Sequence, residues 1–247
     1  MSTALPASLP RVGDSLRVLY RSVGWDLRLQ SRYQIVTVSL VVTAAYGLVL
    51  RLLPDSWLRD ATILLVLADP TMIGFLFVGA LVLFERDAGI TAAVAVSPSS
   101  PALYVWSKAV SLTTVSVVCA VALTVAGHGM NFRMVPLLGG VVLTSLMFVF
   151  IGIVAVVRVR SVNGYLLIVP VFLVPMYLPL LGSAGFAQSP LYYLLPTQGS
   201  LLLIARALES RPAWEALYGV TILGLWLIAS CYAATRSYES HVRGRRS

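Results

Sequence analysis

The sequence predicts an all-α membrane protein with six transmembrane helices, preceded by an amphipathic helix at the membrane surface. Hydrophobic residues make up 58% of the 247 residues and charged residues only 11%, less than half the charged share of an ordinary soluble domain. The mean hydropathy is +0.87, and the charges gather at the ends of apolar runs that approach the roughly 20 residues needed to cross a bilayer. Residues 1–247 are therefore expected to form a single transmembrane domain.

The N-terminal region combines a tail with a surface helix. Residues 1–14 are predicted to be a flexible tail, because Pro6 and Pro10 oppose helix formation. Residues 15–33 follow a helical period, with one apolar stripe made of Leu16, Leu19, Tyr20, Val23 and Leu27 and a separate stripe of four arginines, Arg17, Arg21, Arg28 and Arg32. This pattern predicts a helix in the membrane interface with its arginines toward lipid phosphates, and a merely solvated basic helix is the alternative. The first span is predicted at residues 35–53.

Asp69 and Pro70 interrupt the second apolar run, which is predicted to span the membrane over residues 62–84. Aspartate followed by proline is typical of a helix start, with Asp69 as the N-cap and Pro70 in the first helical position. A helix that began at Pro70 would barely cross a bilayer, so residues 61–68 are expected to extend it beyond a kink. An acidic residue within a span is also a functional candidate. We expect Asp69 and Pro70 to have a structural or gating role, with capping as the favoured interpretation.

A short apolar segment follows the second span. Charges at Glu85, Arg86 and Asp87 end the apolar run, and residues 88–96 are apolar but too few to cross a bilayer. Serines and prolines over residues 97–101 then break any helix. The pattern predicts a short helix at the mouth of two spans, which lies on the membrane or docks in a groove of a partner protein. We favour the partner, although solvation of a helix end would also explain Glu85 and Arg86.

Four further spans are predicted at residues 103–126, 135–157, 164–181 and 214–233. The fifth contains Pro170, Pro175 and Pro179, which predict a kinked or broken helix whose freed carbonyls are satisfied by neighbouring helices. Between the fifth and sixth spans, residues 200–208 form an apolar piece too short to cross, interpreted as a re-entrant or interfacial helix. Residues 234–247 are predicted to be a basic tail.

The distribution of basic residues predicts the orientation. If the N-terminus is cytoplasmic, thirteen of the 18 lysines and arginines lie on the inner side and five on the outer side, as the positive-inside rule requires. The outer five are Arg51, Arg59, Arg133, Arg206 and Arg211. We therefore expect a multi-pass protein of the plasma membrane with both termini in the cytoplasm. The net charge of +8 is explained by this anchoring, so no nucleic-acid partner is expected.

Catalytic motifs are missing from the sequence. It holds no nucleophile elbow, zinc-protease motif or Walker A loop. His128 and His241 have no partners nearby in sequence, and Cys119 and Cys231 lie within apolar runs without disulfide or metal spacing. No metal site and no enzymatic activity are expected. Coupled secondary transport usually needs several charges within the spans, so the energy for any uphill transport must come from another chain.

Several motifs resemble ABC-2 type transporter permeases, and most closely the fluoroquinolone export permease group. They are Asp26-Leu27-Arg28-Leu29-Gln30-x-Arg32-Tyr33, Asp69-Pro70-x-x-x-Gly74-x-x-Phe77-x-Gly79-Ala80, Glu85-Arg86-x-x-Gly89, Val96-Ser97-Pro98, Tyr104-x-x-x-Lys108 and, more weakly, Leu195-Pro196-Thr197-Gln198. The resemblance covers most of the chain and is densest from Asp26 to Lys108. Two positions depart from the pattern: Val94 replaces a bulkier leucine, and Ser97 replaces a threonine.

The resemblance implies an ABC-2 (type V exporter-like) permease fold and a role as the transmembrane subunit of an ABC exporter. Such a subunit moves an amphiphilic molecule, for example a fluoroquinolone-type drug, and can confer antibiotic resistance by drug efflux. It binds no cofactor itself, because ATP and magnesium bind to separate ATP-binding subunits. Its other partners are the lipid bilayer and a second permease, identical or homologous. A loop as short as residues 85–108 could not hold an ATPase domain.

Two groups of site residues follow from the resemblance. ATPase coupling is expected from the short inner helix and its flanks, namely Glu85, Arg86, Gly89, Ala93, Val96, Ser97 and Pro98. Structural or gating roles are expected from Asp69, Pro70, Pro196, Thr197 and Gln198. A secondary transporter that works without ATP, or a membrane scaffold or immunity-type protein, remains the alternative.

Overall fold

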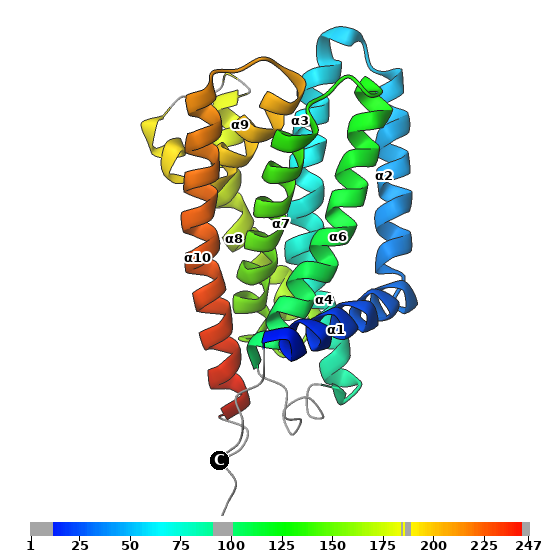
Figure 1. Ribbon diagram of the computed structural model, residues 1–247, viewed down its shortest axis with the longest axis vertical. Helices are drawn as coiled ribbons and strands as arrows, with labels where there is room; N and C mark the ends of the chain where they lie inside the picture. Colours follow the sequence, from blue (N-terminus) through cyan, green and yellow to red (C-terminus); the bar gives the residue numbers. More distant parts are fainter. Residues whose placement is uncertain (1–11, 91–100, 184, 186–188, 244–247) are drawn as a thin grey trace, which may run out of the picture.

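The computed structural model describes residues 12–90, 101–183, 185 and 189–243, and every secondary-structure element in that part of the chain is helical. Six helical stretches are long and apolar enough to cross a membrane, which confirms the predicted all-α, six-span class. They run side by side and form a bundle (Figure 1). Helix α1 (Val12–Arg32) lies at one end of this bundle and the short helix α9 (Pro196–Leu208) at the other, so we call these the α1 end and the α9 end.

The first two helices meet at a sharp turn. Helix α1, Val12–Arg32, runs across the end of the bundle, whereas α2, Ile35–Leu52, runs along it (Figure 1). Gln34 makes the change of direction with a φ of 64°, in the left-handed region that few side chains tolerate. The predicted tail of residues 1–14 is wrong at its end, because the helix already begins at Val12; residues 1–11 lie outside the described part of the chain.

The second span differs most from its prediction. It is a continuous helical rod made of α3 (Asp55–Thr71), a π-helical segment η1 (Met72–Phe77) and α4 (Val78–Asp87). Asp69 and Pro70 lie inside α3, so the prediction that Asp69 caps a helix start is wrong. The apolar residues before Asp69 continue the helix without a break. Proline removes an amide donor within the helix, and the wider π turn that follows accommodates this defect.

A tyrosine from a distant helix packs against the π segment. Helix α8, Val162–Ser183, contributes the buried Tyr165, whose hydroxyl donates a 2.6 Å hydrogen bond to the carbonyl oxygen of Phe75. The two rings stack with centroids 5.7 Å apart. Gly79 makes room for this contact, because a Cβ atom there would lie 2.0 Å from Cε1 of Tyr165. Tyr165 therefore stabilises the π segment, and it fits there because position 79 is a glycine.

Helix α7, Met134–Val156, is the centre of the bundle. Of the 18 residues that form its most apolar stretch, 67% are buried. The corresponding share is 17% for α8 and for α10, Ala213–Arg243. Hydroxyl groups join α7 to α6, Pro101–His128, where Thr113 donates to Ser145 and Ser145 to Ser116 at 3.2 and 3.1 Å. Such bonds stabilise helix contacts in lipid, where burial of apolar area contributes little. The exposed apolar faces of α8 and α10 are left for lipid or for another protein.

The α9 end holds a short helix between the fifth and sixth spans. After the 3-10 turn η2, Pro190–Leu194, helix α9 runs over Pro196–Leu208, four residues earlier than the predicted apolar piece. Pro196 occupies the first helical position, where its missing amide has no cost. Gly199 and Gly219 bring α9 and α10 into close contact, since a Cβ at Gly199 would lie 3.0 Å from the Gly219 carbonyl oxygen.

Helix α8 is continuous through its three prolines, so of the two predicted outcomes, a kink or a break, the break does not occur. Thr197 at the start of α9 is fully buried, and its hydroxyl donates to the carbonyl oxygen of Met176 in α8. Met176 lies in the turn before Pro179. A neighbouring helix thus supplies a donor to the proline-rich stretch, which is the kind of contact that makes prolines tolerable in a membrane helix.

Candidate functional site

Three charged side chains meet in the interior at the α1 end. The Lys108 ammonium on α6 donates to a carboxylate oxygen of Asp26 on α1 and to one of Glu85 on α4. The exposed fractions of Lys108, Asp26 and Glu85 are 2%, 4% and 1%. The hydroxyl of Tyr104 donates a 2.7 Å hydrogen bond to the second oxygen of Glu85. These four residues, the Lys108 cluster, join α1, α4 and α6.

A hydrogen bond and an aromatic stack lie next to the Lys108 cluster. Gln30 on α1 donates a 2.7 Å hydrogen bond from Nε2 to Oγ of Ser111 on α6, and both residues are fully buried. The ring of Tyr104 stacks on Tyr238 of α10 with centroids 4.7 Å apart. The inner face of α1 is therefore held on α6 by two polar contacts one helical turn apart, and α10 reaches the same cluster through an aromatic stack.

The Lys108 cluster contains two carboxylates and one ammonium. Removing ions from water costs several kcal/mol each, and only close pairing offsets this penalty. A buried ion pair is therefore weak evidence for added stability, but removal of one partner is costly because it leaves the other charge buried. In this structure the charge pairing determines how α1, α4 and α6 lie relative to one another.

Glu85 and Arg86, two of the residues expected to take part in ATPase coupling, make contacts within the protein. Glu85 is buried within the Lys108 cluster, and Arg86 donates a 2.6 Å hydrogen bond to the carbonyl oxygen of Val159 in the α7–α8 connection. Gly89 follows the end of α4 with a φ of 73°, a left-handed conformation that favours glycine. Ala93, Val96, Ser97 and Pro98 lie outside the described residues. Any part that Glu85 plays in coupling must act through the position of α4.

Asp69 lies near the middle of the second span. Its side chain is 5% exposed and lies against the Cys119 thiol on α6, which also contacts Thr43 on α2. Its Oδ2 atom has no hydrogen-bond partner among the described residues. A buried carboxylate at this depth is a functional candidate. Of the other candidates, Pro70 lies two residues before the π segment, Pro196 begins α9, and Thr197 bonds α9 to α8.

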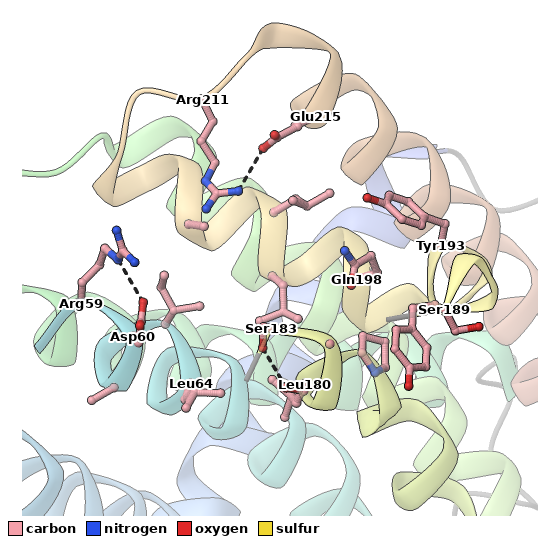
Figure 2. Close-up of a pocket in the computed structure, with 18 of the residues that line it drawn as sticks. Arg59, Asp60, Leu64, Leu180, Ser183, Ser189, Tyr193, Gln198, Arg211 and Glu215 are labelled. Carbon is pink, nitrogen blue, oxygen red and sulfur yellow. Dashed lines mark hydrogen bonds and ion pairs between the residues drawn. The ribbon is translucent and has the colours of Figure 1, made fainter. Parts of the chain in front are cut away.

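A large cavity opens at the α9 end. It has a volume of about 1170 Å³ and is lined by α3, α8, η2, α9 and α10. Figure 2 shows its two sides: Leu64 and Leu180 contribute apolar surface, whereas Gln198 and Tyr193 lie on the opposite wall. Trp57 and Trp214 also line it. An apolar cavity with aromatic side chains and a few polar groups is suited to an amphiphilic ligand. Gln198 is the one predicted gating residue that lines it.

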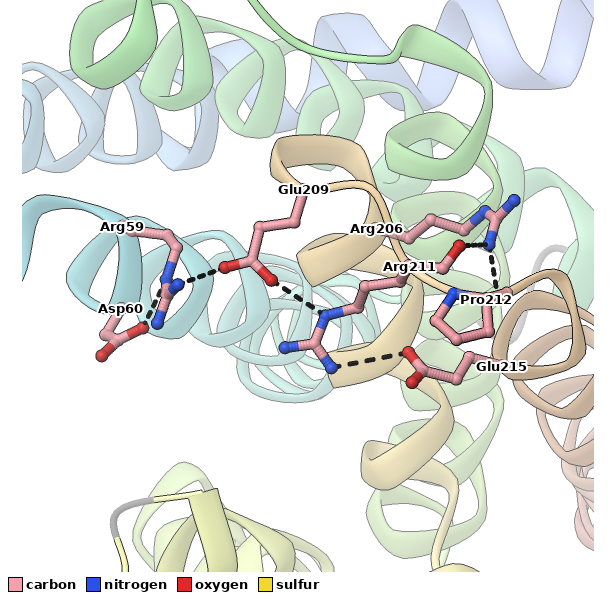
Figure 3. Close-up of polar contacts among 7 residues, drawn as sticks. All are labelled: Arg59, Asp60, Arg206, Glu209, Arg211, Pro212 and Glu215. Atoms are coloured by element: carbon pink, nitrogen blue, oxygen red, sulfur yellow. Dashed lines mark hydrogen bonds and ion pairs between the residues drawn. The ribbon is translucent and has the colours of Figure 1, made fainter.

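A chain of ion pairs borders this cavity (Figure 3). Arg59 on α3 bonds to Asp60 and to Glu209, and Arg211 bonds to Glu209 at 3.1 Å and to Glu215 at 3.4 Å. Arg206 donates to the carbonyl oxygens of Arg211 and Pro212. The ion pairs connect the start of α3 to the α9–α10 connection, so the two sides of the cavity are tied together at its rim.

Sequence reasoning identified Asp26, Tyr104 and Lys108 only as parts of motifs and assigned them no site. One available signal was the opposite charge of residues that all lie at inner ends of predicted helices. Tyr165 is 1% exposed and bonded to Phe75, so it packs in the core of the bundle. In the part of the chain that the structure describes, no group of three or more histidine, cysteine or acidic side chains could hold a metal ion.

The fold and these sites define a multi-pass membrane protein with a buried polar cluster at the α1 end and a large cavity at the α9 end. Residues 17–246 match the Fluoroquinolones export permease protein family, and the chain belongs to this family. Similar proteins are the Fluoroquinolones export permease proteins of two Mycobacterium tuberculosis strains, CDC 1551 and H37Rv. Each is 28% identical over 220 residues, which is 88% of this chain and 93% of the relative. The protein is thus a membrane transport permease of this family.

Proposed function

We propose that this protein is the transmembrane subunit of an ABC exporter that moves an amphiphilic, fluoroquinolone-type molecule out of the cell. The observation that carries the proposal is membership of the export permease family over residues 17–246. Energy would come from ATP hydrolysed by separate subunits, because the connections between the spans are too short for a nucleotide-binding domain. A second permease, identical or homologous, would complete the transporter in the plasma membrane, with both termini in the cytoplasm.

The α1 end is the proposed site of coupling. Residues 88–98 would dock in a groove of the ATPase, and closure of an ATPase pair would displace the segment as a rigid element. The displacement would reach α4 through Gly89 and then α1 and α6 through the Lys108 cluster. Glu85 would act in this scheme by connecting helices, and Arg86 by connecting α4 to the α7–α8 turn.

The test is transport into inside-out membrane vesicles that contain the permease and its co-purifying ATPase. Uptake of a fluoroquinolone, followed by its fluorescence, is expected to need ATP and to persist when an ionophore removes the proton gradient. Asp69→Asn is expected to retain ATP-driven uptake.

A proton-coupled transporter is the second candidate, favoured by the buried, partly unpaired Asp69. Uptake driven by a proton gradient without ATP, and abolished by Asp69→Asn, would replace the proposal with that alternative. A chain without ATPase or transport would be a scaffold.

Gly89 allows a matched test of the coupling segment. Gly89 and Gly24 both have open space around the position of a Cβ atom, but only Gly89 has a positive φ. Gly89→Ala is expected to strain the turn by about 1–2 kcal/mol and to lower ATP-driven uptake several-fold, whereas Gly24→Ala should leave uptake unchanged. Equal uptake by the two variants, at equal amounts of assembled protein, would show that the turn after α4 has no role in coupling.

The outer cavity is proposed as a site for the exported amphiphile. Leu64→Trp would occupy part of the space that the ligand needs, and the loss of about 1.4 kcal/mol of binding free energy would raise the Kd of a fluoroquinolone about tenfold. The control is Leu48→Trp on α2, which is 62% exposed and outside the cavity. Binding is measured by fluorescence polarisation with the permease in nanodiscs. Unchanged affinity in Leu64→Trp would exclude the cavity as the binding site without affecting the permease assignment.

A further inference from the structure

The face of α1 that points away from the bundle carries a row of arginines. Arg17, Arg21, Arg28 and Arg32 are all exposed, and at 3.6 residues per turn they fall within an arc of about 60° on the helix. In the described part of the chain, none of them forms an ion pair with an acidic side chain. The one acidic residue between positions 17 and 32 is Asp26, which is buried on the opposite face and bonded to Lys108.

The opposite face of α1 is anchored, so the arginine row has a defined direction. Asp26 bonds to Lys108, Gln30 bonds to Ser111, and Leu29 between them is 8% exposed. Two buried polar contacts on consecutive turns prevent rotation of the helix about its axis. The arginines therefore point away from the bundle as a preorganised basic surface.

The position of α1 places this surface at a membrane boundary. Helix α1 runs across the bundle and passes through the turn at Gln34 directly into the apolar span α2 (Figure 1). Two aromatic residues flank the arginine row, Tyr20 with 82% exposure and Trp25 with 60%. Tyrosine and tryptophan are enriched at the level of lipid headgroups, where one part of the ring is apolar and the other polar.

We propose that the face of α1 that carries the arginine row binds the headgroups of anionic phospholipids in the cytoplasmic leaflet. A guanidinium group forms paired hydrogen bonds to phosphate oxygens, and a cluster of basic residues beside a membrane span attracts anionic lipid. An acidic protein surface would also attract four arginines, but the flanking aromatic residues and the direct connection to α2 favour lipid. The inference is independent of the transported substrate.

The test counts lipids bound to the purified full-length permease. The protein in mild detergent is titrated with phosphatidylglycerol or with phosphatidylcholine, and bound lipid is measured by native mass spectrometry. Wild-type protein is expected to prefer phosphatidylglycerol. Arg21→Gln combined with Arg28→Gln should weaken that preference by about fivefold per arginine, and the corresponding lysine variants should retain most of it, because charge supplies most of the attraction.

The matched control is Arg158→Gln combined with Arg160→Gln, two exposed arginines at the same end of the bundle. This variant should change the lipid preference less than twofold. The proposal is overturned if wild-type protein binds both lipids equally, or if the control loses the preference to the same extent. It is also overturned if the α1 variant keeps its lipid preference and instead loses a co-purifying soluble ATPase, since the surface would then bind protein.

Discussion

Replacement of Lys108 by methionine is expected to destabilise the protein by about 3–5 kcal/mol, the usual cost of removing one partner from a buried ion pair. Asp26 and Glu85 would remain in the interior at 4% and 1% exposure without their shared cation. The two carboxylates would also repel each other. A change of this size corresponds to a fall of about 10 °C in the melting temperature for a chain of this length.

The measurement is thermal unfolding of the purified protein in detergent, followed by tryptophan fluorescence. Arg158→Met removes an exposed cation at the same end of the bundle and should lower the melting temperature by about 1–2 °C at most. Asp26→Asn and Glu85→Gln, added to Lys108→Met, should recover most of the loss, because uncharged groups carry a smaller desolvation cost. If Lys108→Met melts like the wild type, the charges are not enclosed as the structure places them.

Gly79→Ala is expected to be the most damaging addition of a single methyl group along the second span. The new Cβ would lie 2.0 and 2.2 Å from Cε1 and Cζ of Tyr165, so the ring must move. Tyr165 is 1% exposed and stacks on Phe75, which leaves it little space. Overpacking of this kind costs about 1–3 kcal/mol, and loss of the hydrogen bond from Tyr165 to Phe75 adds about 1–3 kcal/mol.

Gly139→Ala in α7 is the matched control, because nothing lies within 4 Å of the position of its Cβ. That change should be neutral or slightly stabilising, since alanine is the better helix former. In the Gly79→Ala background, Tyr165→Leu should raise the melting temperature by removing the clash. The packing explanation fails if Gly79→Ala and Gly139→Ala have the same effect on thermal unfolding.

The class and the positions of most helices could be predicted because they depend on local composition. An apolar run of sufficient length becomes a helix in lipid, since every backbone amide and carbonyl must be bonded within the segment. The predicted spans at 103–126 and 135–157 therefore lie within two residues of the observed ends of α6 and α7. Charged residues, such as Glu85 and Arg158, marked where several of these apolar runs end.

The interpretation of Asp69 and Pro70 failed because local signals compete with tertiary packing. Both residues favour a helix start, yet the structure continues the helix through them and widens it over Met72–Phe77. The contacts that stabilise the wider turn come from Tyr165, ninety residues away in the sequence. No pattern within the second span records that tyrosine.

Glu85 illustrates the same division at the candidate site. Its position at the end of an apolar run was evident from the sequence alone, and a residue there is ordinarily solvated. Only the tertiary structure decides that it faces inward, because Lys108 is 23 positions away and Asp26 reaches the same ammonium from 82 positions away. Hydropathy and charge along the chain determined that this is a six-span membrane protein, and its short motifs indicated the family. Side-chain pairing between distant helices determined how those motifs are joined, since interactions across a bundle depend on distances in space rather than in sequence.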